Sequence, residues 1–200
     1  MDEQGLVASA RHGDTRAFNE LVLHYQDVVY NLSYRILGDS EAAADASQDA
    51  FLSAYQAMGK FKGGSFKAWL LRITTNACYD QLRSKKRRPT SSLEALYTES
   101  EPATHFINGR QTPEEHALAQ ELGQTIQSGI GTLPPDQRVV LVLSDVQSLS
   151  YKEIARVTGV SLGTVKSRLS RARASLRDYL LSQGELLPAR YRLKDEDRNA

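Results

Sequence analysis

The sequence predicts an all-α fold of two small helical domains joined by a flexible linker, and three observations support this prediction. Apolar residues recur every three or four positions on both sides of residues 89–112, which is typical of amphipathic helices. Within 89–112 that spacing stops, and Pro, Gly, Ser and acidic residues predominate. Strand-like alternation and internal repeats do not stand out. The predicted units are a first domain, a linker, a second domain and a tail, over residues 1–88, 89–112, 113–183 and 184–200.

Three helices are expected in the first domain. They cover residues 8–36, about 40–58 and about 65–83. Gly13 is expected to interrupt the first helix and Gly38 to end it, while Asp39 or Ser40 caps the second. The Gly63-Gly64 pair is expected to turn the chain before the third helix.

Four helices are expected in the second domain. The first begins at Pro113 and is predicted to break at Gly129-Ile130-Gly131 and Leu133-Pro134-Pro135. The other three are expected over residues 135–145, 150–158 and 161–182. The turns between them are so short that these helices must pack against one another.

Charge is segregated along the chain, although 25 basic and 24 acidic residues leave a net charge of only +1. Residues 60–88 contain nine basic residues and one acidic residue, and residues 150–177 contain seven and one. An acidic stretch without Lys or Arg surrounds Asp45 and Asp49. This pattern predicts two sites for nucleic acid and other surfaces for proteins.

Residues 150–168 are predicted to form a helix-turn-helix. Ser150 and Glu153 have capping-box spacing, Gly159 permits a left-handed turn, and Ser161 caps the next helix. In that helix Val165, Leu169, Ala172 and Leu176 share one side. The exposed flanks are expected to carry Thr164, Ser167, Arg168 and Arg171 on one side and Lys166, Ser170, Arg173 and Arg177 on the other. A solvated basic helix is the alternative, but the capping box and glycine turn favour recognition of a DNA major groove.

The first basic segment is less specific. Phe61, Phe66 and Trp69 lie among Lys60, Lys62 and Lys67, a mixture that suits unstacked bases of single-stranded nucleic acid. Packing of Trp69 in a core is an equally good interpretation. The run Lys85-Lys86-Arg87-Arg88 is by itself more typical of a solvated helix end.

Several blocks in a fixed order give the chain a resemblance to the extracytoplasmic-function (ECF) sigma factors of bacteria, within the sigma-70 family. The blocks are Gly13-Asp14-x-x-Ala17-Phe18, Asp45-x-x-Gln48-Asp49-Ala50-Phe51-Leu52-x-Ala54-Tyr55, Phe66-x-x-Trp69-Leu70-x-Arg72-Ile73-x-x-Asn76, Leu133-Pro134-Pro135-x-Gln137-Arg138, and Leu149-Ser150-Tyr151-x-Glu153-Ile154-Ala155 through Gly163-Thr164-Val165-Lys166-Ser167-Arg168. Together they span nearly all of residues 5–182. The resemblance implies a non-catalytic, cytoplasmic factor that binds core RNA polymerase, selects promoters and helps to melt them.

The resemblance also implies three sets of site residues. The clamp of core polymerase would bind Asp45, Gln48, Asp49, Phe51 and Tyr55. The melted minus-ten element would bind Lys62, Ser65, Phe66, Trp69, Arg72, Asn76 and Arg83. The duplex minus-thirty-five element would bind Ser161, Thr164, Lys166, Ser167, Arg168, Arg171 and Arg173, while the supporting helices would contact the polymerase flap. An anti-sigma factor is a further expected partner.

Other function classes find little support. Cys78 is the single cysteine and the four histidines lack ligand spacing, so neither a metal nor another cofactor is expected. Asp45 and Asp49 lie one helical turn apart, but no nucleophile or phosphate loop accompanies them, so no catalytic residue is predicted. The longest apolar run, residues 139–143, is too short to insert in a membrane. The remaining alternative is a helix-turn-helix regulator that acts without core polymerase.

Overall fold

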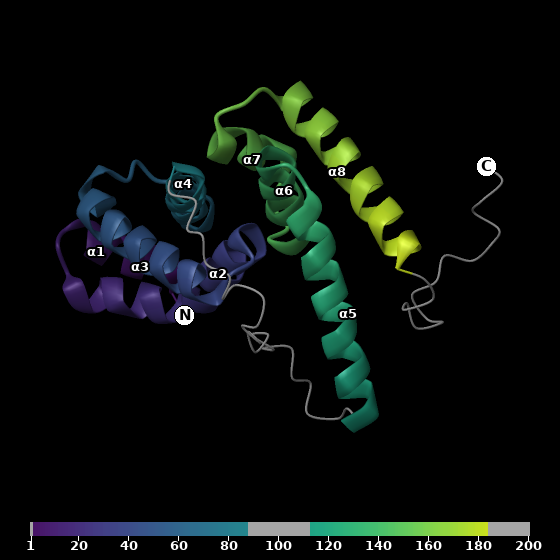
Figure 1. Cartoon of the computed structure of the whole chain (residues 1–200). Coiled ribbons are helices and arrows are strands. Elements are labelled where there is room, and N and C mark those ends of the chain that lie inside the picture. Colours follow the sequence, from purple (N-terminus) through teal and green to yellow (C-terminus); the bar gives the residue numbers. More distant parts are fainter. Residues whose placement is uncertain (1, 88–112, 184–200) are drawn as a thin grey trace.

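The computed structural model describes residues 2–87 and 113–183, and every regular element within these ranges is a helix (Figure 1). The first group contains α1 Glu3–Arg11, α2 Thr15–Leu37, α3 Ser40–Ala57, the 3₁₀ turn η1 Met58–Lys60 and α4 Phe66–Arg87. The second group contains α5 Pro113–Thr132, α6 Pro135–Leu141, the π-helix η3 Val142–Val146, α7 Tyr151–Thr158 and α8 Leu162–Ser182. The all-α prediction is confirmed. The predicted linker and tail lie outside the described residues.

Local signals delimit the helices of the first group. Gly13, with φ +94°, separates α1 from α2, and the Asp14 side chain caps α2 by accepting from the backbone N–H of Arg16 and Ala17. Gly38 ends α2 in the left-handed conformation, with φ +72°. Asp39 then caps α3 through the Ala42 N–H. These positions match the predicted boundaries because each depends on a capping side chain or a glycine nearby in sequence.

Helix α5 corrects one sequence prediction, because it continues through Gly129 and Gly131 and ends at Thr132. The prediction of a break there was wrong. A Cβ at Gly129 would lie 2.7 Å from both Leu176 Cδ1 and Tyr179 Cδ1 of α8. Gly129 therefore permits close approach of α5 and α8, and the chain turns only at Leu133-Pro134.

The predicted helix over residues 135–145 is divided in two. Helix α6 passes into η3, where the Gln147 N–H donates to the Val142 carbonyl five residues earlier. The apolar run from Val139 to Leu143 is fully buried across this junction.

The two groups of helices pack directly against each other. One buried cluster contains Leu32, Ile36 and Leu71 of the first group together with Val139 and Ile154 of the second. Helices α2 and α4 form the contact surface of the first group, which faces α5, α6, η3 and α7 (Figure 1). A second cluster, built around Phe18, Leu21, Tyr25 and Phe66, belongs to the first group alone.

Candidate nucleic-acid and protein interfaces

Helices α7 and α8 form the predicted helix-turn-helix. The Ser150 Oγ accepts from the Glu153 N–H at 3.3 Å, and the Glu153 carboxylate accepts from the Ser150 N–H at 2.9 Å. These two hydrogen bonds complete the capping box. The Ser150 hydroxyl also donates to the Glu153 carboxylate at 2.7 Å, and this bond, followed by the one from the Ser150 backbone N–H, lowers the pKa of Glu153. Gly159 adopts φ +70° between the helices, and Ser161 caps α8 by accepting from the Thr164 N–H at 3.1 Å. The local geometry therefore follows the sequence prediction.

One side of α8 anchors it to the rest of the second group. Val165, Leu169 and Ala172 are buried, and Leu176 packs partly buried against the same cluster. This stripe leaves Ser161, Lys166 and Arg171 exposed. Thr164 and Ser167 are half-buried, and the Ser167 hydroxyl donates to the Thr164 carbonyl at 3.0 Å. The exposed flank of α8 begins at its N-terminal end, which is the end that enters a major groove in helix-turn-helix proteins.

Two arginines of α8 are engaged with carboxylates that sequence reasoning did not identify. Arg168 Nη2 donates to Asp136 Oδ2 at 2.6 Å, and the Arg168 side chain is only 24% exposed. Arg173 makes two bonds to Asp145, through Nε at 3.0 Å and Nη2 at 2.6 Å. Burial alone would raise the pKa of Asp145, but hydrogen bonds from Arg173 and Ser144 lower it overall. No local sequence signal could have revealed these pairs, because their members are 32 and 28 residues apart.

The turn before α4 is flanked by a cluster of three aromatic rings. The rings of Phe61 and Trp69 have centroids 5.1 Å apart, and those of Phe66 and Trp69 are 5.5 Å apart. Phe61 and Phe66 are only 5% and 2% exposed, whereas Trp69 is half-buried. In this structure the Phe66 ring is therefore buried inside the cluster, and Trp69 is the ring of the three that is partly exposed.

Polar groups of the turn and of α4 lie around this cluster. Lys62 and Ser65 are exposed on the turn, and Ser65 Oγ accepts from the Ala68 N–H at 3.1 Å. Further along α4, Arg72, Asn76 and Arg83 are exposed, and Arg83 pairs with Asp80 at 3.0 Å. The structure thus places the predicted minus-ten residues along one turn and the following helix.

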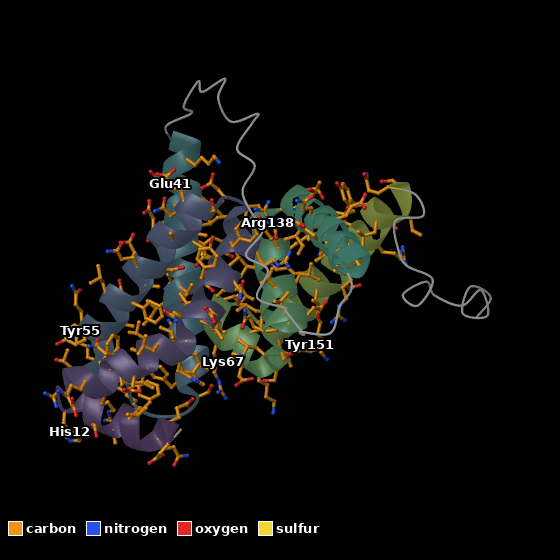
Figure 2. The ribbon with its side chains drawn as sticks, turned by 90° about the horizontal axis from the view of Figure 1, so that it is seen from below. His12, Glu41, Tyr55, Lys67, Arg138 and Tyr151 are labelled. Atoms are coloured by element: carbon orange, nitrogen blue, oxygen red, sulfur yellow. The ribbon has the colours of Figure 1, made fainter. Side chains whose placement is uncertain are left out.

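Helix α3 presents the predicted core-binding residues between two open grooves. Asp45, Gln48 and Asp49 are exposed on α3. Asp49 lines a groove of about 590 Å³ against α4, whereas Gln48 and Phe51 line one of about 370 Å³ against α2. Tyr55, which is labelled in Figure 2, is 48% exposed. Its ring is edge-on to that of Phe18, with ring centroids 5.1 Å apart. The predicted residues therefore lie on one ridge.

Sequence reasoning missed that α2 contributes the opposite wall of the second groove. Its residues there are Gln26, Asp27, Tyr30 and Asn31. Their spacing along α2 would have placed them on one face, but nothing in the sequence indicated that this face lies beside α3.

Neither a metal centre nor a membrane span is found in the part of the chain that the structure describes. Residues 2–87 and 113–183 hold no group of three or more His, Cys, Asp and Glu side chains that could bind a metal ion. No helix in these ranges is long and apolar enough to cross a membrane. Cys78 is fully buried, and burial raises the pKa of its thiol to about 11.

Family models of known proteins match both groups of helices. The family model described as sigma-70 region 2 matches residues 21–88, and the model described as sigma-70 region 4 matches residues 123–176. The first match covers α3, α4 and most of α2, and the second covers the helix-turn-helix. Because both groups of helices match sigma-70 regions, a helix-turn-helix regulator that acts without core polymerase is disfavoured.

Full-length relatives agree with these matches. The RNA polymerase sigma-H factor of Pseudomonas aeruginosa is 39% identical over 176 residues, which cover 87% of this chain and 91% of that protein. The ECF RNA polymerase sigma-E factor of Escherichia coli K12 is 36% identical over 178 residues, covering 88% of this chain and 93% of that protein.

Solved structures share the fold as well. CnrH in complex with the cytosolic domain of CnrY has a TM-score of 0.66 and 27% identity, covering 92% of this chain and 99% of that one. The sigma factor RpoE of Bartonella quintana, in complex with the anti-sigma factor NepR, has a TM-score of 0.64 and 26% identity, covering 83% and 98%. Similarity over nearly the whole length, with both sigma regions in order, shows that this chain belongs to the ECF sigma factors of the sigma-70 family, non-enzymatic factors that bring RNA polymerase to promoters.

Proposed function

We propose that this chain directs core RNA polymerase through three surfaces: the α3 ridge for the enzyme, the turn before α4 together with α4 for the minus-ten element, and α8 for the minus-thirty-five element. The observation that carries the proposal is the helix-turn-helix, in which a capped α7 and a left-handed Gly159 present the polar flank of a capped α8. Its place of action is the bacterial cytoplasm, where core polymerase transcribes.

At the minus-thirty-five element, two residues on one flank of α8 read bases and the other polar residues of this surface contact the backbone. Thr164 and Arg168 approach the base edges, because they lie on the flank that follows the cap at Ser161. Lys166, Arg171 and Arg173 neutralise phosphates, with Ser161 and Ser167 beside them. To bind a phosphate, Arg173 must either leave its ion pair with Asp145 or hydrogen-bond to both groups at once.

At the minus-ten element, the turn before α4 receives an unstacked base. Lys62 and Ser65 supply polar groups at the turn, and the exposed part of Trp69 supplies a stacking surface. Because the Phe66 ring is buried, it does not contact the base. It packs against Trp69 and holds that ring in place. Arg72, Asn76 and Arg83 follow the strand along α4. Favourable binding of the open strand offsets the cost of unstacking, so melting needs no covalent step on this chain.

On the polymerase side, the acidic ridge of α3 contacts the clamp. Asp45 and Asp49 supply charge, Gln48 supplies an amide, and Phe51 and Tyr55 supply apolar area at the edges of the ridge. Holding both DNA-binding surfaces on one enzyme makes the second DNA contact intramolecular, so weak separate contacts give a tight complex. The helices that support α8 contact the flap.

An anti-sigma factor is proposed as a regulatory partner, because a structural relative was solved with one. We expect that a protein encoded near this gene binds the purified chain and blocks its association with core polymerase. Pull-down of each neighbouring gene product, followed by competition with core, measures this. Failure of all neighbours to bind would contradict local anti-sigma control.

The test of the function is transcription from a genomic fragment library by bacterial core polymerase, with and without this chain. New start sites that share two spaced elements are expected only when the chain is present. The double variant Asp45→Ala/Asp49→Ala should lose core binding, whereas Arg168→Ala should retain it. Absence of start sites, combined with binding of duplex DNA by the chain alone, would favour the helix-turn-helix regulator instead.

A further inference from the structure

Helix α1 packs against the core of the first group, next to the turn that precedes α4. Val7 and Ala10 of α1 are buried in the same cluster as Phe61 and Phe66. Figure 1 shows α1 on the side of the first group that faces away from α5–α8. The sigma-70 region 2 model begins at residue 21, so α1 lies outside the family match.

A polar contact joins the start of α1 to the core of the first group. The Tyr25 hydroxyl of α2 donates to Oε2 of the Glu3 carboxylate. Tyr25 is only 5% exposed, and burial, followed by the hydrogen bond to Glu3, raises the pKa of its hydroxyl. The hydroxyl therefore remains a donor at neutral pH. A hydrogen bond to a carboxylate is stronger than one between neutral groups, so Glu3 fixes the polar end of a ring that is otherwise buried.

Ring contacts continue from Tyr25 to the turn. The centroid of the Tyr25 ring lies 5.5 Å from that of Phe66, and the Phe66 centroid lies 5.5 Å from that of Trp69. Phe61 lies edge-on to Phe66 at 5.9 Å and contacts Trp69 as well. Because protein interiors are close-packed, a ring that shifts must displace its neighbour. The orientation of Trp69 therefore depends on that of Tyr25.

Helix α1 also contacts the segment that leads into the turn. It packs against η1 Met58–Lys60, in which Met58 is buried. The Phe61 N–H donates to the Met58 carbonyl at 3.1 Å, which connects η1 to the first ring of the turn. Helix α1 thus supports the turn at both ends, through η1 and Phe61 at its start and through Tyr25 and Phe66 at its close.

We propose that Glu3 is a positioning residue for capture of the minus-ten base: through Tyr25 and Phe66 it holds the Trp69 ring in the orientation that stacks on the base. Helix α1 is then part of the base-receiving site, although Glu3 acts only through other residues. Stacking on DNA rests on the proposed function of Trp69, whereas the dependence of the Trp69 ring on Glu3 does not.

Four variants of the full chain test the proposal. Glu3→Ala removes the acceptor while keeping a good helix former in α1, and Tyr25→Phe removes the donor while keeping the ring. Glu3→Gln retains an acceptor oxygen and should restore the contact. Gln4→Ala changes the exposed neighbouring side chain of α1 and serves as the control.

The environment of Trp69 is measured by acrylamide quenching of its fluorescence, since it is the single tryptophan of the chain. Glu3→Ala and Tyr25→Phe should raise the quenching constant above the wild-type value, because a less constrained ring is more accessible. Glu3→Gln and Gln4→Ala should leave it unchanged. Wild-type quenching in both Glu3→Ala and Tyr25→Phe would overturn the link between Glu3 and the Trp69 ring.

Base capture is measured by the affinity of the holoenzyme, formed with core polymerase, for a labelled single strand that carries the minus-ten element recovered in the transcription selection. Glu3→Ala and Tyr25→Phe should weaken binding by about fivefold, the lower end of the loss expected when stacking on one base is removed. Glu3→Gln and Gln4→Ala should bind as the wild type does. Wild-type affinity in Tyr25→Phe would overturn the positioning role.

Strands with one abasic site, placed at each position of the element in turn, separate positioning from general damage to the fold. The position at which the wild-type holoenzyme loses most affinity marks the stacked base. There Glu3→Ala should add little to the loss, whereas at other positions the two losses should add. Additive losses at every position would overturn the proposal. If the wild-type holoenzyme binds no strand, the proposed function fails, while the quenching of Trp69 still decides whether Glu3 positions that ring.

Discussion

Residues of the same type on α8 have different roles because their partners differ. Arg168 makes a single short bond to Asp136, which leaves its other guanidinium donors for DNA. Arg173 makes two bonds to Asp145, which tie α8 to η3. Lys166 and Arg171 are exposed. A count of basic residues along the helix cannot separate these cases.

Arg168→Ala should weaken binding of the holoenzyme to its promoter by about tenfold or more, the loss expected when one side chain stops reading a base. Binding to core polymerase should not change, because Arg168 lies away from the α3 ridge. Competition between promoter variants, with Lys166→Ala for comparison, measures the effect. Lys166→Ala should weaken binding to all variants alike and reduce its salt dependence. Promoter affinity unchanged by Arg168→Ala would remove this residue from the base contacts.

Cys78 should make the folded chain less stable in alkali. Burial raises the pKa of its thiol to about 11, while an unfolded cysteine ionises near a pKa of about 8.5. Below the unfolded value both states hold the proton and the full contribution is present. As the pH rises toward 11, the unfolded chain loses its proton first, so the free energy of unfolding falls.

Urea titrations of the wild-type chain and Cys78→Ala from pH 7 to pH 11 measure this contribution. Comparing the slopes with pH separates the thiol from the tyrosines that both chains contain. Equal slopes would show that the thiol has the same pKa in the folded and unfolded states. The native thiol should also resist alkylation at neutral pH.

Among the elements, the α5–α8 pair shows how a glycine inside a helix can serve packing. Gly129 lies within α5, where its missing side chain leaves room for Leu176 and Tyr179. Gly123 lies in the same helix, but a Cβ there would meet nothing within 4 Å. The two glycines have the same cost in helix propensity but different neighbours.

Gly129→Ala should lower the free energy of unfolding by about 1–3 kcal/mol, because the added methyl group must push α8 away or displace two side chains. Gly123→Ala should instead raise it by about 0.5–1 kcal/mol through helix propensity alone. Urea unfolding of the two variants gives both values. A higher free energy of unfolding for Gly129→Ala would show that α8 can shift to make room for the methyl group without loss of packing.

At the scale of the whole molecule, the common core makes the two sigma regions a cooperative unit. Leu32, Ile36 and Leu71 are fully buried in a cluster that the second group completes. Separation of the groups exposes this apolar surface, at about 25 cal/mol for each Å².

We therefore expect unfolding of the free chain to be one transition. Trp69 is the single tryptophan and reports on the first group, whereas far-ultraviolet circular dichroism reports on both groups. The two signals should give the same urea midpoint in the wild-type chain. They should separate in Gln127→Arg, because the new cation would face the partly buried Arg35, whose hydrogen bond to Gln127 joins the two groups. Different midpoints in the wild-type chain would show that the shared core adds little to stability.

Several local features could be predicted from the sequence. Ser150, Glu153, Gly159 and Ser161 specify the helix-turn-helix through caps and a left-handed turn, all within a few residues of one another. The buried stripe of α8 follows from the spacing of its apolar residues. The continuation of α5 through Gly129 could not be predicted, because its cause lies on α8 almost fifty residues later.

The sequence by itself determined most of the helices, their apolar faces and the family, since caps, glycines and residue spacing act over one or two turns. Only the tertiary structure decided which groups remain available for recognition. It buried Phe66 beneath Trp69, brought a face of α2 beside α3, and set Asp136 between Tyr79 and Arg168. The physical reason is that these contacts join helices far apart in the chain, and helical spacing fixes the direction of a side chain but not the neighbour that it meets.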